Sequence, residues 1–236
     1  MANITTVIFD MYETLAHNSP ELWHGIFETI CRAQKLSVDP MELYHHWKTL
    51  EVNFRRDRLN LEEPEKSAPF KSYEQAWADC FQGTFQDLSL PGDAAAAARA
   101  SVDGMSTREV YADAVEALPQ IQARWRTAIL SNADDDYLNP TLQRLGSRFE
   151  AVLSSQQARA YKPHPAPFLQ VMKMLGVQPQ ECVYVGDSQF DDVLGAGRVG
   201  MVTVWVSRDG TPPDPKLPAP DFQVSALTEL PQVLSR

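Results

Sequence analysis

The sequence predicts an α/β protein: a doubly wound parallel sheet that is interrupted, after its first strand, by an all-helical insertion. From about residue 110 onward, short continuous apolar runs alternate with segments of helical periodicity, a pattern typical of parallel strands joined by helices. Between residues 16 and 109 the apolar side chains recur at helical spacing, and we find no convincing strand. We therefore expect a sheet domain formed by residues 1–15 and 110–236, and a helical domain formed by residues 16–109.

The first strand is expected at Val7–Phe9, a short apolar run that ends abruptly in Asp10. Because a central strand of a parallel sheet is buried on both faces, a continuous apolar run fits such a strand. In the insertion, Ser19 suits the N-cap of a helix and Pro20 its first position. The spacing of the apolar residues then predicts helices at about 20–31, from 40 to beyond 54, at 73–88 and around 94–98, with a loop at 60–71.

After the insertion, strands and helices follow one another. We expect strands at 127–130, 149–153, 182–185 and 201–206, and an edge strand at 221–224. Helices are expected at 112–125, 138–145, 166–175 and 227–234. One more helix is expected after the strand at 182–185, and it continues through residue 196. Gly195–Gly200 matches the G-x-G-x-x-G pattern, but a dinucleotide fingerprint must directly follow a strand and open a helix. This segment comes after the Asp187 loop, inside or at the end of a helix and before a strand, so we reject a dinucleotide site.

Composition narrows the class of protein and of partner. A net charge of −10 disfavours nucleic acid or an anionic membrane as partner. Three widely separated cysteines without a C-x-x-C pair indicate reduced thiols rather than a disulfide framework. We find neither a signal-peptide pattern at the N-terminus nor an apolar stretch long enough to span a membrane. We therefore expect a cytoplasmic monomer or homodimer that acts on a small molecule.

Polar side chains follow four of the expected strands. In strand order they are Asp10 with Thr14, Ser131 with Asn132, Lys162, and Gly186 and Asp187 with Asp192. In open α/β sheets, ligands bind at the carboxyl ends of the strands, so these side chains are placed for chemistry. Any one of them has a simple explanation as a turn or capping residue, but four at one edge of one sheet indicate a site.

The chemistry of these groups is complementary. Asp10 can act as a nucleophile and form an acyl-type intermediate. Together with Asp10, Asp187 and Asp192 supply the oxygen ligands that Mg²⁺ prefers. Ser131 and nearby backbone N–H groups can hold anionic oxygens, and Lys162 supplies the cation that an anionic substrate requires in an acidic protein.

The combination Asp10-x-x-x-Thr14, Ser131-Asn132, Lys162-Pro163 and Gly186-Asp187-Ser188 with Asp192 closely resembles the four motifs of the haloacid dehalogenase (HAD) superfamily. The resemblance spans the whole chain and implies a Rossmann-like core with a helical C1-type cap. It implies that Asp10 is the nucleophile and that Ser131 and Lys162 stabilise the phosphoryl group. It also implies a Mg²⁺ site formed by Asp10, Asp187, Asp192 and the backbone carbonyl of residue 12. From the same motifs, we count Thr14 as a catalytic candidate and Asn132 as a substrate-binding candidate.

The chain departs from this pattern at two positions. HAD phosphatases usually carry a second Asp, the general acid and base, where this chain has Tyr12, and a Gly where it has Glu13. Tyr, with a pKa of about 10, is a poor base at neutral pH, and loss of a general acid/base typically costs about 10²–10⁴-fold in rate. Glu13 could instead do the acid/base work from the next position.

Two further interpretations stay open at this point. The 2-haloacid dehalogenase branch does carry Tyr at position 12 and needs no Mg²⁺, yet Asp187 and Asp192 resemble the metal-binding phosphatase type. We expect a Mg²⁺-dependent phosphatase that acts on a small anionic, phosphorylated metabolite through an aspartyl phosphate on Asp10. The alternatives are a metal-independent 2-haloacid dehalogenase and a non-catalytic regulatory protein that binds phosphate and metal.

Overall fold

The structure is a computed structural model that describes residues 4–235. Its centre is a six-stranded, all-parallel sheet in the order β3-β2-β1-β4-β5-β6. The strands are β1 (Thr6–Phe9), β2 (Arg126–Ser131), β3 (Ala151–Ser154), β4 (Cys182–Gly186), β5 (Val202–Val206) and β6 (Phe222–Val224). The chain leaves the sheet after β1, forms a block of helices and returns at β2. The α/β fold with a helical insertion that the sequence predicts is therefore confirmed.

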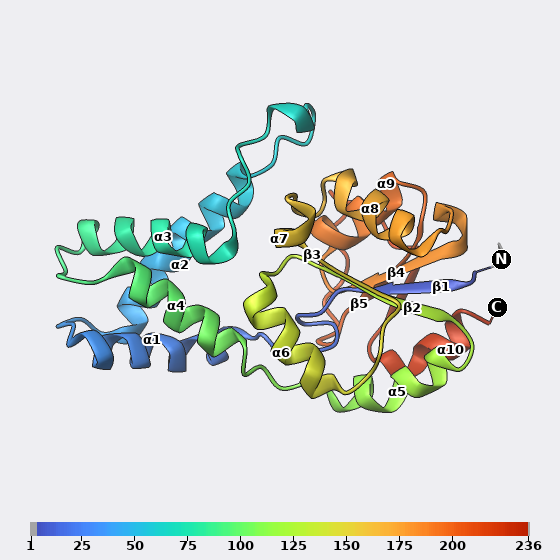
Figure 1. The fold of residues 1–236 in the computed structure, drawn as a ribbon, viewed down its shortest axis with the longest axis horizontal. Coiled ribbons are helices and arrows are strands. Elements are labelled where there is room, and N and C mark those ends of the chain that lie inside the picture. The colour runs from blue at the N-terminus through green and yellow to red at the C-terminus, as the bar shows by residue number, and fades with distance from the viewer. Residues whose placement is uncertain (1–3, 236) are drawn as a thin grey trace. The chain divides into compact units, whose positions relative to one another are not determined.

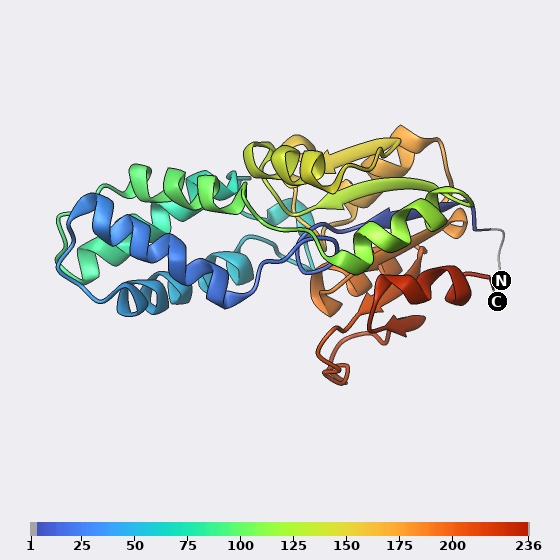
Figure 2. The same ribbon diagram turned by 90° about the horizontal axis from the view of Figure 1, so that it is seen from below.

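Helices cover both faces of the sheet (Figures 1 and 2). Helices α8 (Pro165–Leu175) and α9 (Gly195–Arg198) lie on one face, and α5 (Ala112–Gln122) and α10 (Leu230–Val233) lie on the other. Alternate residues of each strand point to opposite faces. On the α8 side, fully buried strand residues such as Ile8 and Leu130 pack against Phe168. Short helical turns η2 (Pro179–Glu181) and η4 (Leu227–Glu229) complete this part of the chain.

The register of the central strands brings the expected site residues to one edge. Phe9 pairs with Ile129 of β2 and with Val185 of β4. The backbone N–H of Asp10 continues this pairing by donating to the Val185 carbonyl at 2.9 Å. Because all three strands run in the same direction, the residues that follow them meet at the carboxyl edge of the sheet.

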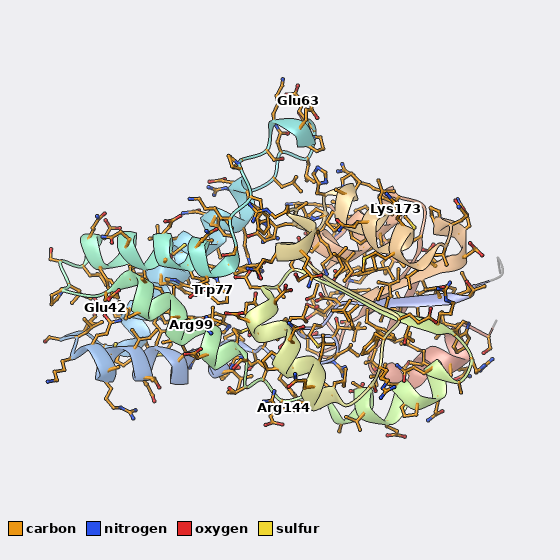
Figure 3. All side chains as sticks on the ribbon, viewed as in Figure 1. Glu42, Glu63, Trp77, Arg99, Arg144 and Lys173 are labelled. Atoms are coloured by element: carbon orange, nitrogen blue, oxygen red, sulfur yellow. The ribbon has the colours of Figure 1, made fainter. Side chains whose placement is uncertain are left out.

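The inserted segment forms a helical unit with its own core. Its helices are α1 (Pro20–Gln34), α2 (Pro40–Asp57), α3 (Tyr73–Asp87) and α4 (Ala94–Met105), and the α2–α3 segment carries the turn η1 (Pro64–Lys66). Both α1 and α3 pack against α2 and α4. Trp23, Trp47 and Trp77 (the last labelled in Figure 3) are buried in this core, with ring centroids of Trp23 and Trp47 5.2 Å apart. These tryptophans therefore belong to the core of the unit.

By their contacts, the residues form two compact units: 1–17, 109–132 and 141–236 in one, and 18–108 with 133–140 in the other. The second segment of the helical unit was not expected from the sequence. It joins that unit because Asp134 caps α3, accepting hydrogen bonds from the backbone N–H groups of Tyr73 and Glu74 at 2.8 Å each. The expected division into a sheet domain of residues 1–15 and 110–236 and a helical domain of residues 16–109 stays a prediction.

Several elements differ locally from the expected ones. Helix α6 (Asp135–Leu145) begins three residues earlier than expected, and β3 begins two residues later. A single turn, α7 (Ser155–Ala158), was not anticipated; Ser154 caps it by accepting from the backbone N–H of Gln157 at 3.0 Å. Instead of a regular helix after β4, the chain forms a π-helix, η3 (Gln189–Leu194), which continues into α9.

No helix within residues 4–235 is long and apolar enough to cross a membrane. The three cysteines are buried and unpaired with one another.

Gly195 of the rejected dinucleotide pattern opens α9 against Phe168, where a Cβ would lie 2.6 Å from the ring. Its small size is therefore required for packing.

Candidate active site

Lys162 is the centre of the polar cluster at the carboxyl edge of the sheet. Its side chain is almost completely buried, and Nζ donates to Asp10 Oδ1 at 2.8 Å, Asp192 Oδ1 at 2.6 Å and the Tyr184 hydroxyl at 2.8 Å. Burial alone would lower the pKa of Lys162, but the carboxylates of Asp10 and Asp192 hold that pKa well above its ordinary value. Lys162 therefore stays an ammonium group in contact with the nucleophile candidate.

Two residues fix the position of this lysine. Asn132, directly after β2, accepts from the backbone N–H of Lys162 at 2.8 Å and donates to its carbonyl at 3.1 Å. The Tyr184 hydroxyl donates its proton to the Leu130 carbonyl at 2.6 Å and therefore accepts from Lys162. Asn132 thus holds the loop that carries Lys162, and its role in substrate binding stays a prediction.

Three carboxylates meet beside Lys162. Asp10, Asp187 and Asp192 each offer an oxygen atom, and these atoms lie within 4.8 Å of one another. Asp191, the neighbouring acid, is not part of this group. Burial raises the pKa of Asp192 to about 7 and, reinforced by the charges of Asp192 and Asp10, raises that of Asp187 well above its ordinary value. If all three were ionised, these carboxylates would carry more negative charge than one lysine can balance.

Backbone geometry selects Asp192 over Asp191. The turn that begins η3 brings Asp192 back over the end of β4, where Oδ2 accepts from the backbone N–H of Ser188 at 2.9 Å. This approach is possible because residue 186 is a glycine: a Cβ there would lie 2.2 Å from Asp192 Oδ2. Single π-helical turns frequently occur at functional sites, and here the turn delivers a carboxylate to Lys162.

The donor set fits Mg²⁺. Mg²⁺ binds through a few carboxylate oxygens and keeps several waters, and the three carboxylates of Asp10, Asp187 and Asp192 are such ligands. Burial and the charges of neighbouring acids raise the pKa values of Asp187 and Asp192, and a divalent cation held between these carboxylates would favour their ionised form. Among residues 4–235, Asp10, Asp187 and Asp192 are the one group of three or more acids, histidines and cysteines whose ligand atoms lie close enough to hold a metal ion.

Asp187 is held from two sides. The Thr14 hydroxyl donates to Asp187 Oδ1 at 3.2 Å, and the Trp205 indole N–H donates to the Asp187 carbonyl at 2.6 Å. Thr14 is fully buried. Its predicted place among the site residues is therefore matched by a direct contact with a metal-ligand candidate.

The two unusual residues, Tyr12 and Glu13, lie in the turn after Asp10. The Tyr12 side chain is buried, and its hydroxyl is 3.3 Å from Thr141 Oγ1. Glu13 has a φ of 61°, in the left-handed region that favours glycine, and its Oε2 accepts from the Tyr111 hydroxyl at 3.1 Å. The conformation explains the glycine of the usual pattern. The catalytic roles considered for Tyr12 and Glu13 stay predictions.

The sequence brought attention to most of this cluster but not to all of it. Asp10, Lys162, Asp187 and Asp192 come together as predicted from their positions, and Ser131 is buried at the end of β2. Tyr184, a direct partner of Lys162, was missed because it lies inside an apolar strand run and looks like a core residue. The indole of Trp205 was missed for the same reason.

The fold and this cluster together define a class of protein: an α/β protein with a parallel sheet, an aspartate at the end of β1 and a helical insertion that follows it. The family model described as "Hydrolase: haloacid dehalogenase-like hydrolase" matches residues 4–200. The chain belongs to this family.

The relatives of this chain include both phosphatases and dehalogenases. Human (Homo sapiens) N-acylneuraminate-9-phosphatase is 26% identical, covering 99% of this chain and 95% of the relative. The (S)-2-haloacid dehalogenase 4A of Burkholderia cepacia is 34% identical, covering 99% and 96%. The solved L-2-haloacid dehalogenase of Xanthobacter autotrophicus matches with a TM-score of 0.73 at 26% identity over 98% of each chain. The magnesium-bound hydrolase YfnB of Bacillus subtilis, at 17% identity, has a TM-score of 0.79 over 99% of this chain and 100% of its own, and shares the fold.

Replacing Lys162 should strongly destabilise the metal-free protein. In Lys162→Met, the carboxylates of Asp10 and Asp192 lose their buried cation, and breaking a buried ion pair typically costs about 3–5 kcal/mol. The measurement is urea unfolding at pH 8, above the pKa of about 7 that burial gives Asp192, so that this acid is ionised. Lys173→Met is the control, since Lys173 is exposed on α8 (Figure 3) and its loss should stay within about 0.5 kcal/mol. If Lys162→Met and Lys173→Met have the same free energy of unfolding, the ion pairs of Lys162 with Asp10 and Asp192 do not stabilise the protein.

Proposed function

We propose that this protein is a Mg²⁺-dependent phosphatase that acts on a small phosphorylated metabolite through an aspartyl phosphate on Asp10. The observation that carries the proposal is the third carboxylate, Asp187. Its carboxylate oxygen lies within 4.8 Å of those of Asp10 and Asp192, and the three carboxylates, once ionised, would carry more negative charge than Lys162 alone offsets. Such a cluster favours a divalent cation and, with it, an anionic phosphoryl group.

In the proposed reaction, a carboxylate oxygen of Asp10 attacks the phosphorus atom while the bond from phosphorus to the ester oxygen breaks. The Lys162 ammonium, 2.8 Å from Asp10 Oδ1, offsets charge on the attacking group. Water then attacks the phosphorus of the aspartyl phosphate while the bond from phosphorus to the Asp10 oxygen breaks; inorganic phosphate leaves, the Asp10 carboxylate is restored, and the proton of the water passes to solvent. Mg²⁺, held by Asp10, Asp187 and Asp192, would act as a Lewis acid toward the phosphoryl oxygens.

Tyr12 limits which leaving groups this mechanism can release. With Tyr12 buried against Thr141, position 12 offers no carboxylic acid to protonate the departing oxygen. An alkoxide leaves poorly without a proton, whereas a nitrophenolate leaves readily. We therefore expect that kcat/KM for an aryl phosphate exceeds that for an alkyl phosphate by about 10²-fold or more, the size of a missing general acid.

A second candidate function is that of a 2-haloacid dehalogenase. It is favoured by Tyr12, which is the residue of that branch at this position, and by the 34% identity to the Burkholderia cepacia enzyme. In that reaction Asp10 would displace the halide, and water would then hydrolyse the resulting ester. The departing halide needs no proton, so Tyr12 imposes no cost. A third candidate is a non-catalytic protein that binds phosphate and metal. It follows from Tyr12, because a tyrosine at this position is a poor general acid and base.

One set of assays distinguishes these functions. We would measure turnover of p-nitrophenyl phosphate and of an alkyl phosphate with Mg²⁺ and with a chelator, and chloride release from (S)-2-chloropropionate. Mg²⁺-dependent release of nitrophenolate, with much slower alkyl turnover, supports the phosphatase. Chloride release that persists in the chelator assigns the dehalogenase instead. Binding of Mg²⁺ and inorganic phosphate without turnover of any substrate assigns the binding protein.

A further inference from the structure

We propose that Arg208 is a positioning residue for the Mg²⁺ site, and that it acts by holding the Thr14 hydroxyl on Asp187. This inference rests on the proposed Mg²⁺-dependent function. Arg208 follows β5 and lies far in sequence from Asp10 and Thr14. Its described hydrogen bonds go to Glu13, Thr14 and Asp113 rather than to the three carboxylates, so it can position them only through another group.

Arg208 binds the turn that follows the nucleophile. Its Nη2 donates to the Thr14 carbonyl at 2.7 Å, and its Nε points to the Glu13 carbonyl at 3.4 Å. The planar guanidinium fork presents donors in a fixed geometry, so these contacts restrain two successive peptide groups. Glu13 has a φ of 61°, a left-handed conformation that is unfavourable for a residue other than glycine unless the surrounding structure stabilises it. The contacts of Arg208 supply such stabilisation.

Arg208 is itself rigidly held. Its Nη1 donates to Asp113 Oδ2 at 2.9 Å, and the same carboxylate oxygen accepts from the backbone N–H of Leu227 at 2.8 Å. The guanidinium carbon lies 3.7 Å from the centroid of the Tyr111 ring, and the Tyr111 hydroxyl donates to Glu13 at 3.1 Å. Two anchors in α5 and its N-cap therefore fix the arginine that fixes the turn.

The turn passes this restraint to a metal-ligand candidate. Fixing the Thr14 backbone places its hydroxyl 3.2 Å from Asp187 Oδ1, while Trp205 holds the Asp187 carbonyl. Trp205 and Arg208 belong to the same segment, so the end of β5 restrains Asp187 at both its backbone and its carboxylate. Asp187 and Arg208 also line one cavity of about 340 Å³, through which Asp187 can be reached.

Groups that orient metal ligands typically change metal affinity by about 10–100-fold when they are replaced. We therefore expect the Kd for Mg²⁺, measured by titration calorimetry on the metal-free protein, to rise by about 10–100-fold in Arg208→Met. Thr14→Val, which removes the hydroxyl, should cause a similar rise. The double variant should bind Mg²⁺ no more weakly than Thr14→Val alone, since Arg208 acts through that hydroxyl.

Arg126→Met is the matched control. Arg126 also pairs with an acid, Glu150 at 2.8 Å, and donates to a carbonyl, that of Leu175 at 2.9 Å, but it lies at the opposite edge of the sheet, where β2 begins. Its loss should leave the Kd for Mg²⁺ unchanged. Thermal unfolding of each variant checks that it is folded; should Arg208→Met unfold, Arg208→Lys, which keeps the charge but not the fork, is expected to give a smaller rise in Kd.

The outcomes separate this inference from the proposed function. An unchanged Kd in folded Arg208 variants overturns the inference and leaves the Mg²⁺ site intact. Fully multiplicative effects of Arg208→Met and Thr14→Val on the Kd also overturn it, since the two residues would then act independently. A wild-type protein that binds no Mg²⁺ at millimolar concentration overturns the proposed function, and the inference with it.

Discussion

Asp10→Asn should abolish turnover, with kcat falling by at least about 10⁴-fold, because an amide cannot replace a carboxylate as nucleophile. The variant should stay folded. Asn is nearly isosteric with Asp, and it removes one of three charges that repel one another beside Lys162. The measurement is single-turnover release of nitrophenolate and of chloride, so that both proposed chemistries are covered.

The matched control is Asp191→Asn, which removes the same charge from the adjacent π-helix but lies outside the three-carboxylate group. We expect this variant to keep activity within a few-fold of the wild type. An Asp10→Asn enzyme that retains most of its activity would exclude a covalent intermediate on this residue, whether the substrate is a phosphate ester or a haloacid.

Tyr12→Asp should increase the hydrolysis of alkyl phosphates, by about 10²–10⁴-fold in kcat/KM. The new carboxyl group could protonate the departing alkoxide and then take a proton from the attacking water. The gain should be much smaller for p-nitrophenyl phosphate, whose leaving group needs no proton. The Tyr12 hydroxyl lies 3.3 Å from Thr141 Oγ1, and Lys162 keeps its own hydrogen bonds to Asp10 and Asp192 in this variant.

Tyr12→Asn distinguishes the effect of a new proton donor from the effect of a smaller side chain. It matches Asp in shape but carries no proton to transfer, and we expect it to behave like the wild type toward both phosphates. If Asp and Asn at this position give equal rates, the missing general acid is not what limits phosphate hydrolysis, and the haloacid reaction becomes the stronger candidate.

Much of the fold could be predicted from local patterns. The apolar run Val7–Phe9, the later alternation of strands with helices, and the helical periodicity of the insertion depend on the side-chain periods of strand and helix. The principal site residues could also be predicted, because a parallel sheet must bring the ends of its strands to one edge. Asp10, Lys162, Asp187 and Asp192 were predicted in this way, and the structure brings them together; their roles stay predictions.

The sequence by itself determined the α/β class, the helical insertion and the acids, lysine and polar groups at the strand ends. Only the tertiary structure decided which of Asp191 and Asp192 reaches Lys162, because the π-helical turn and the space above Gly186 make that choice. It also decided the partners Tyr184 and Arg208, which lie 22 and 194 residues from the groups that they contact, Lys162 and the Thr14 carbonyl. Periodicity encodes which face of an element is buried, but it carries no record of which distant side chain lies opposite. Such contacts are fixed only when the whole chain packs.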